Sequence, residues 1–415
     1  MQKTLVVAGG GAAGFFAAVT AARMNPGLKV ILVEKSGKLL SKVKVSGGGR
    51  CNVTHACFSI PEMFRKYPRG ANFVKKTFHQ FFTTDTIQWF EERGVRLKTE
   101  SDGRMFPVSN SSQTIIDCLL QEANKYGIEI RLHHEIKNIY YKSDPLAYEI
   151  RFNNDLSVPA DFICLASGGY PKSSMFDWIL PSGHRIEDPV PSLFTFNMPG
   201  NTVTSLRGIS VPDAQVKISG EALNERGPLL ITHWGMSGPV ILKLSAWGAR
   251  ILKTKDYRFE ILVNWLGDRT DILIRDEIQM LRHSSGGKKI RQKNTWDLPQ
   301  RLWEWLVEQS GIPDIHWADL SAPLLNVLVR NLTNQSFKVE GKTTFKEEFV
   351  TAGGLLLSEI HHHTMESLIR PGLYFAGEIL DVDGVTGGFN FQHAWTSGFI
   401  AGKSIAEKSM NMDDR

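Results

Sequence analysis

The chain has 415 residues, of which 42% are hydrophobic and 22% are charged. This composition is typical of a globular protein, and the length exceeds what one ordinary hydrophobic core holds, so we expect two or three domains. Its 48 basic and 43 acidic residues give a formal net charge of +5, and the basic residues are dispersed along the chain. The sequence therefore carries no strong nucleic-acid signal, and an anionic small molecule would suit this charge equally well.

The cysteines and the apolar segments exclude several other classes of protein. The four cysteines form no Cys-x-x-Cys pair, which argues against a dithiol relay, an iron–sulfur cluster and a disulfide framework. Reduced thiols are the simplest explanation, and we expect a cytoplasmic protein. Residues 5–22 are apolar, as in a secretory signal, but their glycine spacing has the better explanation given below. No other apolar stretch is long enough to span a bilayer, so we expect no membrane segment.

The first 35 residues predict a strand, a glycine-rich turn, a helix and a second strand. Residues 4–8 (TLVVA) form the apolar run that a parallel strand buried on both faces requires, and residues 9–14 interrupt it with glycines. The helix extends to about residue 23, where an Asn-Pro-Gly sequence stops it before the second strand at 28–35. Together these elements form a βαβ unit of ordinary length.

The elements that follow alternate less regularly. A loop rich in lysine and glycine is expected at 36–54, and mostly helical segments at 58–93 and 112–126. The alternating pattern that follows, to about residue 152, favours antiparallel strands, and residues 162–167 (FICLAS) predict another buried strand.

The sequence changes in character between about residues 191 and 345. Short segments typical of strands come first, to about 265, and amphipathic segments typical of helices follow from about 266. Buried strand patterns then return at 349–357 and 373–378, and a closing helix is expected at 391–409. We therefore predict one discontinuous α/β domain, residues 1–190 and 346–415, interrupted by an inserted domain at 191–345.

The glycine-rich turn carries the first chemical signal. Gly9, Gly11 and Gly14 form a G-x-G-x-x-G motif directly after a strand and at the start of a helix. In such a motif the first glycine permits a tight turn, the second lets a pyrophosphate approach the backbone, and the third allows close helix packing. Glu34 follows 20 residues after Gly14, at the end of the second strand, where a carboxylate can accept hydrogen bonds from a ribose diol. This pattern predicts a dinucleotide site, and it suits NAD and FAD equally because both contain ADP.

The far end of the chain supplies a second glycine-rich signal. Gly377 and Glu378 follow a buried strand, and Gly387-Gly388-Phe389-Asn390 lead into the closing helix. A carboxylate at a strand end can hold ribityl hydroxyls, and glycines let the backbone approach a flat ring. The helix N-terminus would stabilise negative charge on a reduced flavin. Taken alone, the same segment could be an ordinary loop before a helix.

Segments along the whole chain resemble a known family. It comprises bacterial FAD-dependent oxidoreductases described as aminoacetone-oxidase-like flavoproteins, which have the two-part flavin fold of glutathione reductase. The matching segments include SKVKVSGGGRCNVT (41–54), GRMFPVSNSSQTI (103–115), THWGMSGPVIL (232–242) and the long block at 364–402. The chain departs from the pattern at Leu40, where a glycine is common, and at 173–183, where a glycine-rich stretch is usual.

The resemblance implies a Rossmann-like FAD-binding domain with an inserted domain, β-rich at about 191–265 and helical at about 266–345, that faces the substrate and acts as a lid. It places the adenine end of FAD at Gly9 to Gly14 and Glu34, and the ring near Ser46 to Asn52 and Gly387 to Asn390. The residues predicted to bind FAD are Gly9, Gly11, Ala12, Ala13, Gly14, Glu34, Lys35, Lys42, Ser46, Gly48, Gly49, Arg50, Cys51, Asn52, Ile136, Ala166, Ser167, Gly168, Gly377, Glu378, Gly387, Gly388, Phe389 and Asn390.

No residue stands out as catalytic. Arg50 can place a fixed positive charge near a phosphate or a reduced flavin, while Cys51 and His233 are weaker candidates with ordinary structural explanations. The tract at 361–363 (HHH) lacks neighbouring acidic or cysteine ligands, so we expect a solvated turn and no metal site. The tryptophans at 296, 303, 305 and 317 suit helix packing better than a base-stacking surface.

These signals predict an FAD-dependent oxidoreductase that transfers a hydride between flavin N5 and a small-molecule substrate, with an amine slightly favoured by the resemblance. FAD would be bound non-covalently, and NAD(P)H could serve as a transient co-substrate. Oxidase and dehydrogenase activities both remain open, as does the oligomeric state. Two alternatives also stay open: a flavoprotein that binds or modifies RNA, and a flavin-binding module without catalytic activity.

Overall fold

The βαβ unit at the N-terminus forms the centre of a parallel sheet in the computed structural model, which describes residues 2–143, 146–292, 294–343 and 350–413. Strands β1 (Thr4–Ala8) and β2 (Lys29–Val33) pair in parallel and are joined by helix α1 (Ala12–Met24). Both strands are apolar and almost fully buried, as parallel strands covered on both faces require. The predicted βαβ unit is confirmed.

Three further parallel strands complete this sheet, in the order β20-β10-β1-β2-β6. Strand β10 (Phe162–Leu165) lies beside β1, and β20 (Leu373–Phe375) lies beside β10. Strand β6 (Glu129–Arg131) pairs in parallel with β2, so the antiparallel pairing expected for this segment is wrong. The physical reason is the preceding helix α6 (Ser112–Lys125), because a crossover helix returns the chain in the same direction.

The antiparallel prediction holds for the next segment, where β7 to β9 form a separate three-stranded sheet. Another small antiparallel sheet has the order β3-β5-β4. The strands of these two sheets are β7 (Ile136–Ser143), β8 (Leu146–Phe152), β9 (Ser157–Ala160), β3 (Thr54–His55), β4 (Leu97–Thr99) and β5 (Arg104–Pro107).

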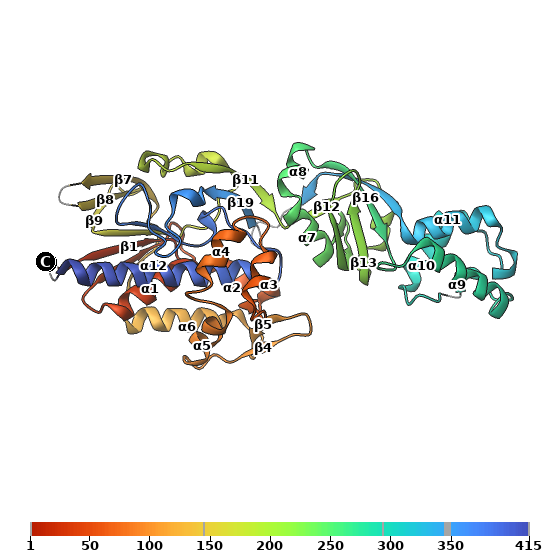
Figure 1. Ribbon diagram of the computed structural model, residues 1–415, viewed down its shortest axis with the longest axis horizontal. Coiled ribbons are helices and arrows are strands. Elements are labelled where there is room, and N and C mark those ends of the chain that lie inside the picture. Colours follow the sequence, from red (N-terminus) through yellow and green to blue (C-terminus); the bar gives the residue numbers. More distant parts are fainter. Residues whose placement is uncertain (1, 144–145, 293, 344–349, 414–415) are drawn as a thin grey trace. The chain divides into compact units, whose positions relative to one another are not determined.

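The closing helix α12 (Phe389–Asp413) runs beside α1 (Figure 1). The two backbones lie close together, because Gly398 and Gly402 of α12 face the carbonyl oxygens of Ala13 and Ala17 in α1. Aromatic rings extend this contact: the ring centroid of Phe16 lies 4.5 Å from that of Trp89 and 4.7 Å from that of Trp395. The first and last helices of the chain therefore share one core.

The segment expected to be a loop at 36–54 contains helix α2 (Ser41–Gly49). The helix is kinked, since Ser46 is extended and Gly47 and Gly48 have positive φ angles. Lysine, valine and serine at 41–46 are compatible with a helix, and the three glycines that suggested a loop occupy its distorted end. The other short helices here, within the predicted helical region, are α3 (Ile60–Met63), α4 (Ala71–Thr77) and α5 (Thr83–Glu91).

The contacts divide the chain into two compact units. Unit 1 comprises Met1–Pro191 and Lys346–Arg415, and unit 2 comprises Ser192–Phe345. Strands β11 (Ile186–Ser192) and β19 (Val350–Leu355) are neighbours in a two-stranded sheet, so the chain leaves unit 1 and returns to it at adjacent positions.

Unit 2 contains a sheet in the order β17-β16-β13-β14-β15-β12-β18. Its strands are β12 (Thr195–Asn197), β13 (Ser210–Ile218), β14 (Asn224–Ile231), β15 (Gly235–Ser237), β16 (Arg258–Asn264), β17 (Gln335–Glu340) and β18 (Lys342–Thr343). Its helices are α7 (Pro239–Trp247), α8 (Ala249–Thr254), α9 (Asp271–Ser284), α10 (Gln300–Gln309) and α11 (Ala322–Thr333).

The predicted order of strands followed by helices is too simple for unit 2. Helices α7 and α8 lie within the segment expected to be β-rich, and β17 and β18 follow the helical part. Strand β17 is placed by its register with β16, a long-range pairing that no local pattern reveals. Trp303, Trp305 and Trp317 are buried in the core of this unit and Trp296 packs against it, which confirms the packing role predicted for them.

No helix among the described residues combines the length and the apolar composition needed to cross a membrane.

Candidate cofactor-binding and active site

Most of the residues predicted to bind a cofactor lie at one edge of the five-stranded sheet of unit 1. Gly9 follows β1, Glu34 follows β2, Ala166 follows β10 and Gly377 follows β20. Because these strands are parallel, their carboxyl ends meet at the same edge, where ligands bind in open α/β sheets. Residues from both ends of the chain therefore converge.

The three glycines of the motif have different surroundings. Gly9 has a φ of +117°, and a Cβ built on it would lie 2.3 Å from the carbonyl oxygen of Ala166. A Cβ on Gly14 would lie 2.0 Å from the carbonyl oxygen of Gly9. A Cβ on Gly11, in contrast, would meet nothing within 4 Å. Gly9 and Gly14 are thus required by the packing of the protein itself, whereas Gly11 borders open space.

That space at Gly11 fits a dinucleotide. Gly11 is the N-cap of α1, and Ala12 and Ala13 follow it as the first helical residues. The backbone N–H groups at a helix N-terminus have no partner within the helix and attract phosphate oxygens. A pyrophosphate lying over Gly11 would meet these groups without a side chain in its path.

Glu34 is oriented by hydrogen bonds to backbone groups. Its Oε2 accepts from the Gly10 N–H at 2.9 Å, and its Oε1 accepts from the Ser36 N–H at 2.9 Å. The Glu34 carbonyl also accepts from the His134 N–H at 2.9 Å, which brings Ile136, at the start of β7, into this neighbourhood. The carboxylate thus lies against the glycine turn, where a ribose next to the pyrophosphate would be within reach. The adjacent Lys35 places its Nζ 5.4 Å from the ring centroid of Tyr170.

A second carboxylate, Glu378, lies at the end of β20. Its Oε1 accepts from the Thr351 N–H at 3.0 Å, and its Oε2 forms an ion pair with Lys42. A Cβ on Gly169 would lie 2.8 Å from both Glu378 Oε1 and Thr351 Oγ1. The Thr351 hydroxyl is buried and has no hydrogen-bond partner within the described part of the chain. These polar groups suit the hydroxyls of a ribityl chain, and Thr351 was not among the residues predicted to bind the cofactor.

The two predicted ring-facing segments contact each other directly. The Asn52 amide, oriented to satisfy its neighbours, accepts from the Gly388 N–H at 2.9 Å and donates to the Thr54 carbonyl at 3.0 Å. A Cβ on Gly388 would lie 2.5 Å from the same Thr54 carbonyl oxygen. A Cβ on Gly48 or Gly49 would meet nothing within 4 Å, so no protein atom crowds these two glycines.

The turn before α12 is held in place by side chains. Asn390 exchanges two hydrogen bonds with the backbone of Gly384, at 2.8 and 2.9 Å. Tyr67 donates to the Phe389 carbonyl at 2.7 Å. These contacts fix the direction of the helix N-terminus, which would face negative charge on a bound flavin.

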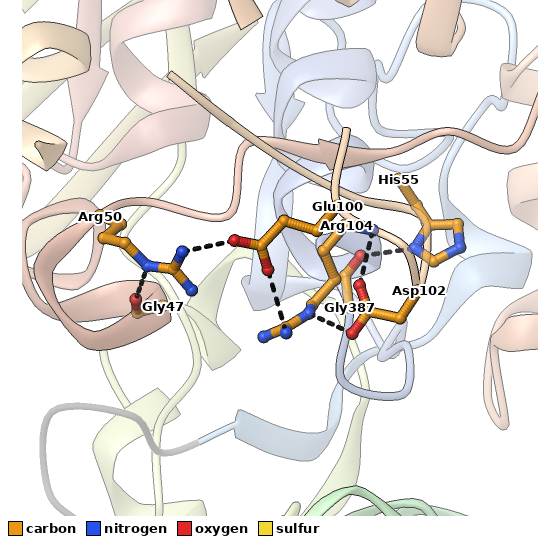
Figure 2. Close-up of polar contacts among 7 residues, drawn as sticks. All are labelled: Gly47, Arg50, His55, Glu100, Asp102, Arg104 and Gly387. Atoms are coloured by element: carbon orange, nitrogen blue, oxygen red, sulfur yellow. Dashed lines mark hydrogen bonds and ion pairs between the residues drawn. The ribbon is translucent and has the colours of Figure 1, made fainter. Parts of the chain in front are cut away.

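A chain of charged side chains adjoins this junction (Figure 2). Arg50 donates to the Gly47 carbonyl at 3.3 Å and to Glu100 at 2.5 Å. The second oxygen of Glu100 accepts from Arg104 at 3.2 Å. His55 Nδ1 lies 3.1 Å from the Gly387 carbonyl, so both glycine segments are tied to this region.

Of the charged residues Arg50, Glu100 and Arg104, only Arg50 was predicted to belong to the site. Glu100 precedes the matching segment that begins at residue 103, and Arg104 is its second residue. The resemblance of that segment was the signal that could have found them. Charged residues next to a turn usually indicate only a solvated surface.

The other catalytic candidates gain no support. Cys51 is fully buried, and burial raises the pKa of its thiol to about 12, so the thiol is protonated at neutral pH. The structure therefore argues against Cys51 as a nucleophile. His233 belongs to unit 2, is exposed, and packs its ring 4.3 Å from that of Trp234.

The histidine tract at 361–363 lies in a turn. Across residues 2–143, 146–292, 294–343 and 350–413, no group of three or more potential ligands is arranged to hold a metal ion.

Comparisons with known proteins give the same fold over the whole chain. The model of the HI0933-like protein Rossmann domain matches residues 3–404. The ribosomal RNA dihydrouridine synthase of Escherichia coli (strain K12) is 28% identical over 418 residues, which cover 97% of this chain and 98% of that protein. The 3-dehydro-bile acid delta(4,6)-reductase of Clostridium scindens is 26% identical over 411 residues, with coverage of 97% and 98%.

Among solved structures, the open conformation of a flavocytochrome c3 fumarate reductase superposes with a TM-score of 0.51 at 19% identity. The match covers 98% of this chain and 79% of that chain, and it shows a shared fold. The family model spans nearly the entire sequence. The chain therefore belongs to the HI0933-like Rossmann-domain family.

Proposed function

We propose that the protein binds FAD non-covalently at the carboxyl edge of the parallel sheet and transfers a hydride between flavin N5 and a carbon of a small molecule. The observation that carries this proposal is the hydrogen bond between Asn52 and Gly388, which joins two glycine segments from opposite ends of the chain beside open space at Gly48 and Gly49. With its adenine half at Gly11 and its flavin ring at this junction, one FAD would contact both the N-terminal and the C-terminal segment of unit 1.

The protein's own groups would bind and orient the cofactor. Amides at the start of α1 would hold the pyrophosphate, Glu34 would accept from the ribose, and Glu378 would accept from the ribityl chain. The N-terminus of α12 and the guanidinium of Arg50 would stabilise negative charge at the ring. When bound, the flavin supplies the hydride chemistry itself.

The names of the two curated relatives favour reduction as the physiological direction. One is a dihydrouridine synthase and the other a delta(4,6)-reductase. We infer that this protein likewise delivers a hydride to an electron-poor carbon–carbon double bond, with NAD(P)H as the electron source. The resemblance to aminoacetone-oxidase-like flavoproteins supports amine oxidation as the alternative direction. The free thiols of all four cysteines suit the cytoplasmic location that we expect.

Anaerobic titration of the purified holoenzyme separates these directions. NADH, NADPH and a panel of primary amines are each added while the flavin absorbance is followed, and an α,β-unsaturated ketone or oxygen is then admitted. We expect NADH or NADPH to bleach the flavin, and the unsaturated ketone to restore its colour. Bleaching by an amine with reoxidation by oxygen would instead assign an oxidase. A flavin that responds to none of these would indicate a binding module.

The E. coli relative also supports a second candidate, reduction of uracil in RNA, because its name specifies ribosomal RNA. The test adds unmodified ribosomal RNA and free uridine to the reduced enzyme and measures dihydrouridine by mass spectrometry. Formation in RNA but not in uridine, with a steep loss as salt rises, would establish this candidate. If the enzyme instead forms no dihydrouridine in RNA and turns over a small unsaturated ketone equally fast at low and high salt, RNA reduction is excluded.

A further inference from the structure

Glu100 has no role in the proposed FAD binding, yet it contacts Arg50, which directly follows Gly48 and Gly49. We propose that Glu100 is a positioning residue, which holds the Arg50 guanidinium beside the flavin ring and thereby raises the reduction potential of the flavin. The inference rests on the proposed location of the ring at the junction of Gly48 and Gly388. It assigns a role to a residue that does not itself touch the cofactor.

Arg50 is held on two edges and one face. Its Nε donates to the Gly47 carbonyl at 3.3 Å, its Nη1 donates to Glu100 Oε1 at 2.5 Å, and its guanidinium carbon lies 4.0 Å from the centroid of the Phe106 ring. Phe106 is itself fully buried. A planar guanidinium restrained in this way loses most of its rotational freedom, so its charge occupies one place. Among the residues that the structure describes, Glu100 is the only charged partner of Arg50.

Glu100 is in turn restrained from the other side. Its Oε2 accepts from Arg104 Nη2 at 3.2 Å, and Arg104 Nε donates to Asp102 at 2.7 Å. The Arg104 guanidinium also faces the Phe106 ring, at 5.5 Å. The carboxylate is therefore shared between two arginines, which fixes its orientation (Figure 2). Both guanidinium groups also lie over the Phe106 ring.

This arrangement differs from an ordinary surface ion pair. The side chains of Arg50 and Glu100 are 33% and 26% exposed, so solvent screens them only in part. Exposed ion pairs usually join side chains that rotate freely, whereas three contacts restrain Arg50 here. A fixed positive charge beside a flavin, in contrast, favours the reduced form, because reduction adds negative charge to the ring.

Positioning and simple charge compensation predict opposite signs. If Glu100 only neutralises Arg50, removing it leaves more positive charge near the ring and the potential rises. If Glu100 positions Arg50, the Arg50 side chain in the Glu100→Ala variant is no longer held beside the ring, and the reduction potential falls. In Glu100→Gln, the amide oxygen still accepts from Arg50 while the negative charge is lost, so the potential should equal or exceed that of the wild type.

The test measures the midpoint potential of FAD-loaded protein for the wild type, Arg50→Met, Glu100→Ala, Glu100→Gln and the double variant Arg50→Met/Glu100→Ala. We expect Arg50→Met to lower the equilibrium constant for two-electron reduction about tenfold, a fall of ~30 mV. Glu100→Ala should lower it about threefold or more, and should add nothing in the Arg50→Met background. The matched control is Glu129→Ala, which removes the carboxylate of another Glu–Arg pair in unit 1, with Arg131, and should leave the potential unchanged.

Four results overturn the inference: an FAD-loaded Arg50→Met protein with an unchanged potential, a higher potential in Glu100→Ala, an equal shift of Glu100→Ala in both backgrounds, or no shift in Glu100→Ala while Arg50→Met does shift. A lower potential in Glu100→Ala that Glu100→Gln does not show supports it. A wild-type protein that takes up no FAD refutes the proposed flavin site instead, so the two failures are distinguishable.

Discussion

At the scale of single residues, the glycines of the first turn have two different roles. Gly9 and Gly14 are enclosed by backbone atoms of the protein, and a side chain on either would collide with a carbonyl oxygen. Gly11 is extended, with φ −99° and ψ −172°, and has open space beside it. Two of these glycines therefore serve folding, and the third leaves room for a ligand.

This difference makes Gly11→Val a clean probe of the cofactor site. Valine adopts extended backbone angles readily, so the free energy of unfolding without FAD should change by less than ~0.5 kcal/mol. The branched side chain would occupy the path of the pyrophosphate, and FAD affinity should fall about 100-fold, or ~3 kcal/mol. Fluorescence titration with FAD and urea unfolding of the apoprotein measure the two effects. Gly9→Ala is the contrasting control, because it should destabilise the fold itself. Unchanged FAD affinity in Gly11→Val would refute the placement.

His393 predicts how stability depends on pH. It is buried in the first turns of α12, and burial lowers its pKa from 6.5 to about 4. As pH falls below 6.5, the unfolded chain gains a proton that the folded chain takes up only near pH 4. The free energy of unfolding should therefore decrease across this window, by about 3 kcal/mol in total.

Urea unfolding of the wild type and His393→Gln at pH 7 and pH 4.5 checks this prediction. Glutamine does not titrate, and it can still donate to the Gly377 carbonyl that His393 Nε2 approaches at 3.3 Å. Burial also lowers the pKa of His184, but that residue titrates in both proteins and cancels from the difference. Equal loss of stability in the two proteins would mean that His393 is not the group responsible.

At the scale of elements, the packing of α12 on α1 positions both halves of the site. Gly398 and Gly402 lie one turn apart on α12 and allow the two helix backbones to approach. The N-terminus of α1 borders the pyrophosphate position, and that of α12 follows the ring-facing glycines. The distance between these N-termini therefore depends on small residues far from either end of the cofactor.

Gly402→Val tests this packing. A Cβ at position 402 would lie 2.4 Å from the Ala17 carbonyl oxygen, so the helices must separate. We expect a loss of about 1–3 kcal/mol in the free energy of unfolding, although replacing an unhindered helix glycine normally increases stability. Lys403→Val, at the neighbouring and partly exposed position, is the matched control and should change stability by less than ~0.5 kcal/mol. A stabilised Gly402→Val protein would show that the helices are not in close contact.

At the scale of the whole molecule, the inserted unit is joined to unit 1 at two adjacent points. Strands β11 and β19 are neighbours in one sheet, one on each side of the insertion. Unit 2 has its own buried core, which includes Trp265, Trp303 and Trp317. We therefore propose that the two units fold separately, and that unit 2 contributes to substrate turnover rather than to FAD binding.

Replacing residues 193–345 with a short glycine–serine linker tests this division. FAD binding by the shortened protein should remain within about tenfold of the wild type, which is ~1.4 kcal/mol, because the proposed cofactor residues all belong to unit 1. Turnover of any substrate found for the full chain should be lost. Retained turnover would remove unit 2 from the reaction, and lost FAD binding would show that unit 1 depends on it.

Local sequence patterns were sufficient for features that depend on neighbouring residues. The buried strands, the G-x-G-x-x-G turn with Glu34, and the closing helix all follow from apolar runs and glycine spacing within 35 residues or fewer. These features depend on local backbone geometry, which neighbouring residues in the sequence determine.

Only the tertiary structure decided the contacts between distant segments. The parallel pairing of β6, the return of β17 to the sheet of unit 2, and the polar partners Thr351 and Glu100 each join residues that no local pattern connects. Long-range pairing depends on which surfaces become buried together. The sequence around a charged residue does not indicate whether its side chain faces water or another charge. For that reason the sequence by itself predicted a dinucleotide site that uses glycines from both ends of the chain, while the tertiary structure decided which polar side chains lie beside these glycines.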